Sequence, residues 1–242
     1  QDELSDAVAG SLECAVERLE GRNAATAPFE ELNAWECYHR GLAIQYEFAA
    51  ETNAAAQRHF RRAIELDPNF ALAYARLSYA IVISMIYFEA DDVPHLLDEA
   101  QRLAQTAARL APNDAVIRFA LGRVLLACGE YEQSILHLRD AIERNPNMAQ
   151  AHCGLGDSMA YAGDLDAAMT CFERAVEICP DDPYRWAFLS YGATALLFKG
   201  SYDEAEEWAA RAEAVPNCHY WSTAIRTSAL AHRGRLAEAR DA

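Results

Sequence analysis

The sequence predicts an all-α protein whose helices stack as a right-handed α-solenoid, or superhelix, of helix–turn–helix repeats. The first observation is that Pro112, Pro146 and Pro180 follow one another at intervals of 34 residues. The second is that apolar residues on both sides of Gly129 recur at helical spacing. The third is that strand-type runs rich in Val, Ile and Thr are absent. A fixed period between about 20 and 50 residues is the sequence signature of a repeat architecture.

One repeat unit can be followed in the segment that ends at Pro146. Residues 115–128 carry apolar residues at helical spacing, Gly129 interrupts the pattern, and residues 131–143 resume it. The residue before Pro146 avoids the helical region, so the second helix is expected to end there. A single hairpin of two helices cannot bury its apolar face alone, so neighbouring hairpins must stack.

Small residues recur where these helices are expected to touch. Gly122 recurs as Gly156 in the first helix, and Ala141 recurs as Ala175 in the second. A glycine inside a helix costs up to about 1 kcal/mol relative to alanine. We therefore expect both glycines to lie where two helices pack closely.

Charge and hydropathy exclude several classes of partner. The formal net charge of −16 disfavours nucleic acid and anionic membrane surfaces, because proteins bind both through Lys and Arg. A charge of this size serves mainly solubility, and a basic protein partner is the alternative interpretation. The longest apolar run, residues 77–90, is too short to cross a membrane. We therefore expect neither a nucleic-acid partner nor a membrane partner.

The seven cysteines favour a reducing compartment. Their number is odd, no CxxC pair occurs, and most lie among apolar residues at helical positions. They are therefore expected to be small buried thiols rather than a disulfide framework. The acidic N-terminus has no signal-peptide pattern. We expect a cytoplasmic protein and, because the first residue is not Met, a piece of a longer chain.

The first expected element is an amphipathic helix at residues 2–20, followed by a polar linker at 21–33 that holds Gly21 and Pro28. This helix is either a cap docked on the solenoid or the tail of a preceding domain. We favour docking, because a free helix with an unburied apolar stripe is marginal in water. The stripe consists of Leu4, Val8, Leu12 and Val16.

The remaining chain divides into five repeats and a partial sixth. The second repeat is irregular, because Pro68 and Pro112 are 44 residues apart and ten residues are therefore added. We place the addition around residues 87–97 and in a loop, where insertions cost little and often carry function. A few extra residues are expected in the first repeat's turn, near 51–53. The repeats are expected at about 34–69, 70–112, 113–146, 147–180, 181–217 and, incomplete, 218–242.

These units resemble the tetratricopeptide repeat (TPR) family across about residues 34–242. The 34-residue step, the Leu–Gly pair of the first helix, the small and bulky positions of the second helix and the closing proline carry the resemblance. The segments QDELSDAVAGSLE, NAWECYHRGL and FRRAIELDPNFALAYARLSYA further resemble the C-terminal TPR region of bacterial multidomain regulators. In those regulators an adenylate/guanylate cyclase-like domain, or a DNA-binding domain, precedes a TolB-like region and then the repeats. The resemblance implies a regulatory, signalling scaffold, with any cyclase domain lying before Gln1.

The resemblance also implies that the first helix of each repeat lines a concave groove. Transferring the family's groove positions gives a mostly aromatic set, and aromatic and Arg side chains dominate the binding energy of interfaces. We expect this set to bind a peptide, a helix or a neighbouring domain. The alternative for any single ring is packing in the core. The set is Trp35, Tyr38, Tyr46, Tyr79, Phe119, Arg123, Asp157, Tyr161, Tyr184 and Tyr191.

No catalytic, cofactor or metal site is expected. The sequence has no P-loop, no GxGxxG after a strand, no GxSxG turn and no HExxH spacing. Asp91, Asp92 and His95 are residue types that can hold a metal. We prefer a solvated loop that runs into an acidic helix N-terminus, which the helix dipole favours. The chain is therefore not expected to be an enzyme, although the resemblance allows a nucleotide cyclase domain in the longer protein.

The leading hypothesis is a protein-interaction scaffold that binds a protein or peptide, including another domain of its own parent protein. One alternative is the regulatory half of a class III nucleotide cyclase, and another is a purely structural oligomerisation module. The C-terminal end of the chain is relevant to the oligomerisation alternative. The last helix, 236–242, is expected to be too short to cover Trp221, Ile225 and Leu230, so we expect self-association or fraying through residues 219–242.

Overall fold

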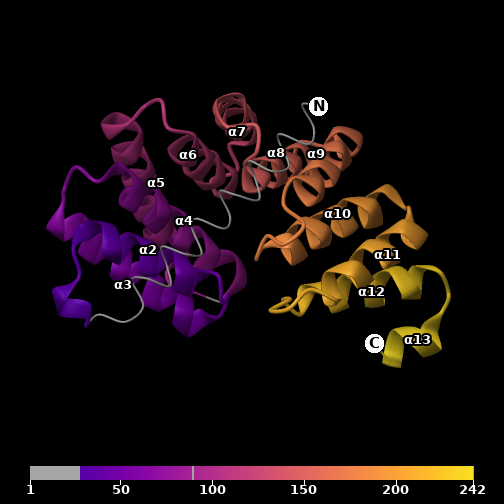
Figure 1. Cartoon of the computed structure of the whole chain (residues 1–242). Coiled ribbons are helices and arrows are strands. Elements are labelled where there is room, and N and C mark those ends of the chain that lie inside the picture. The colour runs from indigo at the N-terminus through magenta and orange to yellow at the C-terminus, as the bar shows by residue number, and fades with distance from the viewer. Residues whose placement is uncertain (1–27, 89, 242) are drawn as a thin grey trace. The chain divides into compact units, whose positions relative to one another are not determined.

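The computed structural model describes residues 28–88 and 90–241, and over these residues it contains twelve α-helices, one short 3-10 turn and no strand (Figure 1). The all-α prediction is confirmed for this part of the chain. The amphipathic helix predicted at 2–20 lies outside the described residues, as does most of the linker predicted at 21–33. The chain divides after Pro146 into two compact units. We call them the N-terminal unit, described over 28–88 and 90–146, and the C-terminal unit, described over 147–241.

The N-terminal unit consists of three stacked antiparallel hairpins. α2 packs on α3, α4 on α5, and α6 on α7. α3 also packs on α4, and α5 on α6, so that each hairpin covers the next. The elements are η1 (Phe29–Glu31), α2 (Ala34–Gln45), α3 (Ala50–Leu66), α4 (Ala71–Tyr87), α5 (Val93–Leu110), α6 (Ala115–Ala127) and α7 (Tyr131–Arg144).

The C-terminal unit repeats the same packing. α8 pairs with α9, α10 with α11 and α12 with α13, while α9 packs on α10 and α11 on α12. Stacking of hairpins is how repeats of this kind bury an apolar face that none can bury alone. The helices are α8 (Ala149–Tyr161), α9 (Leu165–Ile178), α10 (Arg185–Lys199), α11 (Tyr202–Glu213), α12 (Trp221–His232) and α13 (Leu236–Asp241).

The two helices of a hairpin approach closely at the predicted glycines. A Cβ atom built on Gly122 of α6 would lie 2.6 Å from Cγ of Leu138 in α7. A Cβ on Gly156 of α8 would lie 2.8 Å from Cε1 of Phe172 and 2.9 Å from the backbone oxygen of Ala168, both in α9. Real Cβ atoms essentially never come this close to another heavy atom. Close packing at these two glycines is therefore confirmed.

Side-chain hydrogen bonds cap the N-termini of α2 and α6, each of which is the first helix of its hairpin. At α2, Oδ1 of Asn33 accepts a hydrogen bond from the Glu36 amide at 3.0 Å, and Oε2 of Glu36 accepts one from the Asn33 amide at 2.9 Å. This reciprocal pair is a capping box. At α6, Oδ1 of Asp114 accepts from the amides of Val116 and Ile117 at 2.8 and 3.2 Å. Such caps satisfy amides that have no partner inside the helix.

The ten residues added to the second repeat lie mostly in helix, so the prediction of a loop insertion is wrong. α4 has 17 residues where α6 has 13, and α5 has 18 where α7 has 14. Pro94 lies in the first turn of α5, where a proline removes no intrahelical hydrogen bond. The loop between α4 and α5, residues 88–92, is only two residues longer than the loop 128–130.

The extra residues predicted near 51–53 are also helical. They form the first turn of α3, and the turn of this hairpin is 46–49 instead, with Phe48 at a φ of 52°. The Thr52 hydroxyl explains the early start, because Oγ1 accepts a hydrogen bond from the Ala49 amide at 3.0 Å.

The C-terminal end is better covered than predicted. Leu230 is only 2% exposed, and Trp221 and Ile225 are half-buried, so the expectation that α13 leaves Leu230 open is wrong. The physical reason is that α10, α11 and α13 all pack on α12. The apolar surface that is exposed lies elsewhere in this region, at Tyr220 and Leu236.

Candidate interaction surface

The six groove residues predicted in the N-terminal unit differ in exposure. Trp35 is 52% exposed, which is unusual for the largest apolar side chain. The buried members can touch a partner only if their neighbours move. The half-buried members are Tyr46 and Tyr79, and the buried members are Tyr38, Phe119 and Arg123.

The four groove residues predicted in the C-terminal unit divide in the same way. Tyr161, the last residue of α8, is 65% exposed, and Tyr191 of α10 is half-buried. Asp157 and Tyr184 are buried. Across both units, the predicted residues that offer surface to a partner are Trp35, Tyr46, Tyr79, Tyr161 and Tyr191.

Trp35 belongs to a group of four rings, which we call the Trp35 cluster: Trp35, Tyr38, His39 and Phe70. The ring centroids of Trp35 and His39 are 4.2 Å apart, and those of Trp35 and Phe70 are 6.2 Å apart with nearly parallel planes. Phe70 lies 5.1 Å from Tyr38, whose ring is 6.1 Å from the buried ring of Phe60. The half-exposed indole of Trp35 thus packs against the buried rings of Tyr38 and His39.

Sequence analysis missed two members of the Trp35 cluster. His39 follows Trp35 by four residues, and residues four apart lie on one face of a helix, so the spacing could have shown it. Phe70 could not be found this way, because it comes from the residue before α4 and reaches Trp35 only through the stacking of hairpins.

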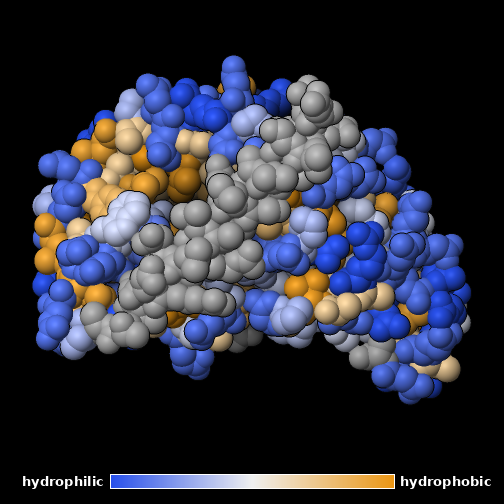
Figure 2. Space-filling model, viewed as in Figure 1, coloured by the Kyte–Doolittle hydropathy of each residue, from blue (hydrophilic) through white to orange (hydrophobic). Residues whose placement is uncertain are grey.

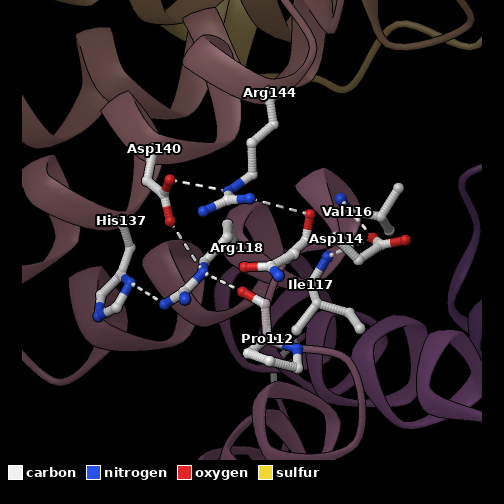
Figure 3. Close-up of polar contacts among 9 residues, drawn as sticks. Pro112, Asp114, Val116, Ile117, Arg118, His137, Asp140 and Arg144 are labelled. Carbon is white, nitrogen blue, oxygen red and sulfur yellow. Dashed lines mark hydrogen bonds and ion pairs between the residues drawn. The ribbon is translucent and has the colours of Figure 1, made fainter.

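A group of polar side chains, which we call the Arg118 clasp, lies on the α6–α7 hairpin (Figure 3). It consists of Arg118, His137, Asp140 and Arg144. Nε of Arg118 lies 2.8 Å from Oδ2 of Asp140, and Nε of Arg144 donates to Oδ1 of Asp140 at 2.8 Å. Arg118 also donates to the carbonyl oxygen of Pro112 at 2.9 Å, and to Nδ1 of His137 at 3.3 Å.

These bonds define the role of the clasp. Arg144 Nη1 donates to the carbonyl oxygen of Asn113 at 3.2 Å, so both arginines hold the loop before α6 against α7. Because Arg118 can only donate, Nδ1 of His137 must be unprotonated. Burial lowers the pKa of His137, and the Arg118 charge lowers it further, while Asp140 opposes them. The clasp therefore stabilises the hairpin, and its donors point at acceptors within the chain.

Cys37, Cys128 and Cys218 lack the environment of reactive thiols. Burial raises the pKa of Cys37, Cys128 and Cys218, which disfavours the thiolate. The six cysteines of the described residues are all free thiols, and three of them, Cys37, Cys153 and Cys179, are buried. Within 28–88 and 90–241, no group of three or more His, Cys, Asp or Glu side chains could hold a metal ion. Over the same residues, no helix has the length and apolar character needed to cross a membrane.

One pocket that sequence analysis did not predict lies in the C-terminal unit. It has a volume of about 380 Å³, is open to solvent, and is formed by the loop before α12 with the two flanking helices and the end of α13. Its charged wall is an ion pair in which Nη1 of Arg226 donates to Oε2 of Glu213 at 2.8 Å. The lining residues are Glu213, Cys218, His219, Tyr220, Thr223, Arg226 and Asp241.

The surface of the visible face is uneven in hydropathy. Figure 2 shows hydrophobic residues gathered at the left of the view, where Figure 1 labels α2 to α5, and mostly hydrophilic residues around α13. Exposed apolar patches often mark interaction sites on proteins. The patch at the left of the view belongs to the N-terminal unit.

Comparison with known proteins identifies the repeats. Residues 119–183 match the family model of the tetratricopeptide repeat. The chain is 33% identical over 87 residues to tetratricopeptide repeat protein 7A of Homo sapiens, and 31% identical over 98 residues to TPR repeat-containing protein YpiA of Bacillus subtilis (strain 168). These matches cover 36% and 40% of this chain, but only 10% and 22% of the relatives, so the chain spans less than a quarter of either protein.

The fold is also found in a solved structure. TTC0263, a thermophilic TPR protein of Thermus thermophilus, is similar with a TM-score of 0.65 and 21% identity. The match covers 82% of this chain and 99% of that one. At this identity the likeness shows the fold, an α-solenoid of TPR hairpins.

Proposed function

We propose that this chain, which is a tetratricopeptide-repeat protein, is an interaction module that binds a peptide, a helix or a neighbouring protein domain. The observation that carries the proposal is the Trp35 cluster, in which a half-exposed indole rests on buried rings. Tryptophan is enriched among the residues that dominate binding energy at protein interfaces. Because the ring is held by its neighbours, less side-chain entropy is lost on binding.

Tyr161 of the C-terminal unit is a second anchor in this proposal. Its ring is exposed at the end of α8, a first helix of a repeat, which is the helix that lines the groove in this family. Tyr46, Tyr79 and Tyr191 offer a smaller part of their surface. Tyr38 and Phe119, which are buried, support the rings of Trp35 and Tyr79 rather than touch the partner.

The biological setting that fits is regulatory. We place the module in a bacterial cytoplasmic signalling protein, where its partner is a second protein or another domain of the same parent. The alternative is the regulatory half of a class III nucleotide cyclase, whose catalytic domain lies outside this chain. The resemblance of residues 1–13, 33–42 and 60–80 to such regulators supports both. Sequencing the complete gene product distinguishes them, because only the second requires a cyclase domain.

The test of the interaction module starts from a random peptide-display library selected against the full chain. Selected peptides are then titrated against Trp35→Ala and Tyr161→Ala. We expect at least one of the two variants to weaken binding by about tenfold or more, the loss typical of an anchor residue. Phe198→Ala is the matched control, because Phe198 is 77% exposed but is not a predicted groove residue.

Two results would speak against the module. One is a library that yields no peptide above background. The other is a set of selected peptides whose affinity is the same for Trp35→Ala, Tyr161→Ala and the unchanged chain. In both cases the exposed aromatic rings have no role in recognition.

A second candidate is self-association through residues 219–242. Tyr220 and Leu236 favour it, because they are 66% and 57% exposed and lie in the same region of the C-terminal unit. Apolar surface of this kind is removed from water when two copies associate.

A further inference from the structure

We propose that the Trp35 cluster binds a cationic side chain, arginine above all, on a basic segment of a partner protein. This inference rests on the proposed function and names the chemistry of its partner. A guanidinium group is attracted to the face of an aromatic ring, and tryptophan is the best of the aromatic residues for this contact.

The geometry of the cluster suits such a ligand. Trp35 is half-exposed, while Tyr38 and His39 are buried and Phe70 is half-buried, so that one indole is accessible on a base that is already packed. The indole is anchored in the first turn of α2, whose start is fixed by the capping box of Asn33 and Glu36. The ring is therefore held in place before a partner arrives.

The exposed charged residues nearest to the cluster in sequence are acidic. The two segments that supply it, 28–39 and 66–75, contain four Asp or Glu residues and no Lys or Arg. Glu30, Glu31 and Asp67 are exposed, so their charges face solvent close to the cluster in sequence. The nearest basic residues along the chain, Arg40 and Arg76, are half-buried and buried. An aromatic ring with exposed acidic residues close to it in sequence favours a cationic ligand over an acidic one.

The same charges argue against one competing occupant, the N-terminal segment of this chain. Residues 1–27 contain six Asp or Glu residues and two Arg, and are therefore acidic. An acidic segment placed on an acidic surface loses affinity through repulsion of like charges. A basic partner gains affinity on the same surface. The net charge of −16 also accelerates the approach of such a partner to the chain.

The chain offers a matched control. Phe198 is an exposed aromatic side chain like Trp35, but it precedes Lys199, which forms an ion pair with Asp166. A ligand that recognises any exposed ring, or only the overall negative charge, should not distinguish the two sites. A ligand that needs an exposed ring in an acidic segment of the chain should require Trp35 alone.

The experiment uses three fluorescein-labelled peptides of equal length and apolar content, whose variable positions are all Arg, all Gln or all Glu. Binding to the full chain is followed by fluorescence anisotropy. We expect the Arg peptide to bind, and its dissociation constant to rise about tenfold or more with Trp35→Ala. Phe198→Ala should change it by less than about twofold. Trp35→Phe should restore part of the affinity, because a ring remains.

The outcomes separate this inference from the proposed function. If the Arg peptide binds Trp35→Ala as well as the unchanged chain, the attraction is non-specific and the inference is wrong. If the Gln or Glu peptide binds as tightly as the Arg peptide and depends on Trp35, the inference is wrong but the interaction module stands. If neither these peptides nor display-selected ones depend on Trp35 or Tyr161, both fail. A melting curve of Trp35→Ala close to that of the unchanged chain excludes unfolding as the cause.

Discussion

His59 in α3 is a buried titratable side chain whose surroundings disfavour its protonated form. It is 8% exposed, and the ring of Phe29 packs edge-on against it with centroids 4.9 Å apart. Burial, and then the charges of Arg40 and Arg58, lower its pKa from 6.5 to about 4. The proton is therefore bound more readily by the unfolded chain than by the folded one.

This difference predicts acid destabilisation. As the pH falls from 6.5 towards 4, the unfolded chain takes up a proton at His59 and the folded chain does not, so the free energy of unfolding decreases. The loss due to His59 should be about 2 kcal/mol at pH 5 relative to pH 7. His59→Leu should remove this part of the pH dependence, while His95→Leu, at an exposed histidine, should not. Urea unfolding at both pH values measures the difference, and equal pH dependence of the two variants would contradict the prediction.

At the scale of the element, the Arg118 clasp ties the α6–α7 hairpin to the loop before it. Asp140→Ala removes the carboxylate that Arg118 and Arg144 share, so we expect a loss of about 1 kcal/mol in the free energy of unfolding. Glu177→Ala is the control, because its ion pair with Arg174 is longer, at 3.7 Å, and more exposed. A double-mutant cycle with Arg118→Ala measures the coupling, and a coupling energy near zero would show that the clasp contributes nothing.

The α8–α9 hairpin gives a steric prediction. Gly156→Ala improves helix propensity by about 1 kcal/mol, but the new Cβ would clash with a ring and with the backbone oxygen of Ala168, which cannot rotate away. We expect the clash to prevail, with a net loss of about 1 to 3 kcal/mol. Gly163→Asn in the same hairpin should have a small effect, because the site is open and Asn tolerates its positive φ of 92°. Thermal unfolding of both variants measures the two effects. If Gly156→Ala is as stable as Gly163→Asn, then α8 and α9 can move apart to accommodate the new Cβ atom.

The elements that could be predicted from the sequence are those whose signal is local and repeated. The 34-residue step, the closing prolines and the glycines at Gly122 and Gly156 predicted both the hairpins and their close contacts, because each helix pair must satisfy the same packing. The insertion in the second repeat was misplaced for the opposite reason. Pro94 is typical of a loop, and equally of the first turn of a helix, which is where it lies in α5.

Exposure of the groove residues could be predicted less well. Tyr38 and Phe119 occupy the same position in their repeats, and both are buried, whereas Trp35 is exposed three residues earlier. Helical spacing groups these residues on neighbouring parts of one face, and it cannot say how far the next hairpin covers that face. Tyr79 illustrates this, since its ring packs edge-on against Phe119 with centroids 5.0 Å apart, across α4 and α6.

At the scale of the whole molecule, net charge and exposed apolar surface act on self-association in opposite directions. A net charge of −16 keeps copies apart at low ionic strength, because like charges repel over about 10 Å in 0.1 M salt. Exposed apolar residues bring them together, and each Å² of apolar area removed from water contributes about 25 cal/mol. Added salt screens only the first effect, so the balance should shift towards association as salt rises.

The region 219–242 is where we expect this balance to be visible. Tyr220 and Leu236 are exposed there, while Leu230 is already covered, so the association should be weak and dependent on concentration. Light scattering across a concentration series, in low and high salt, should show a rising average mass that is greater in high salt. Tyr220→Ser combined with Leu236→Ser should abolish the rise, whereas Phe198→Ser should not, although Phe198 is the more exposed side chain. A constant monomer mass in high salt would show that this end has no self-association surface, and equal loss in the control would place the contact elsewhere.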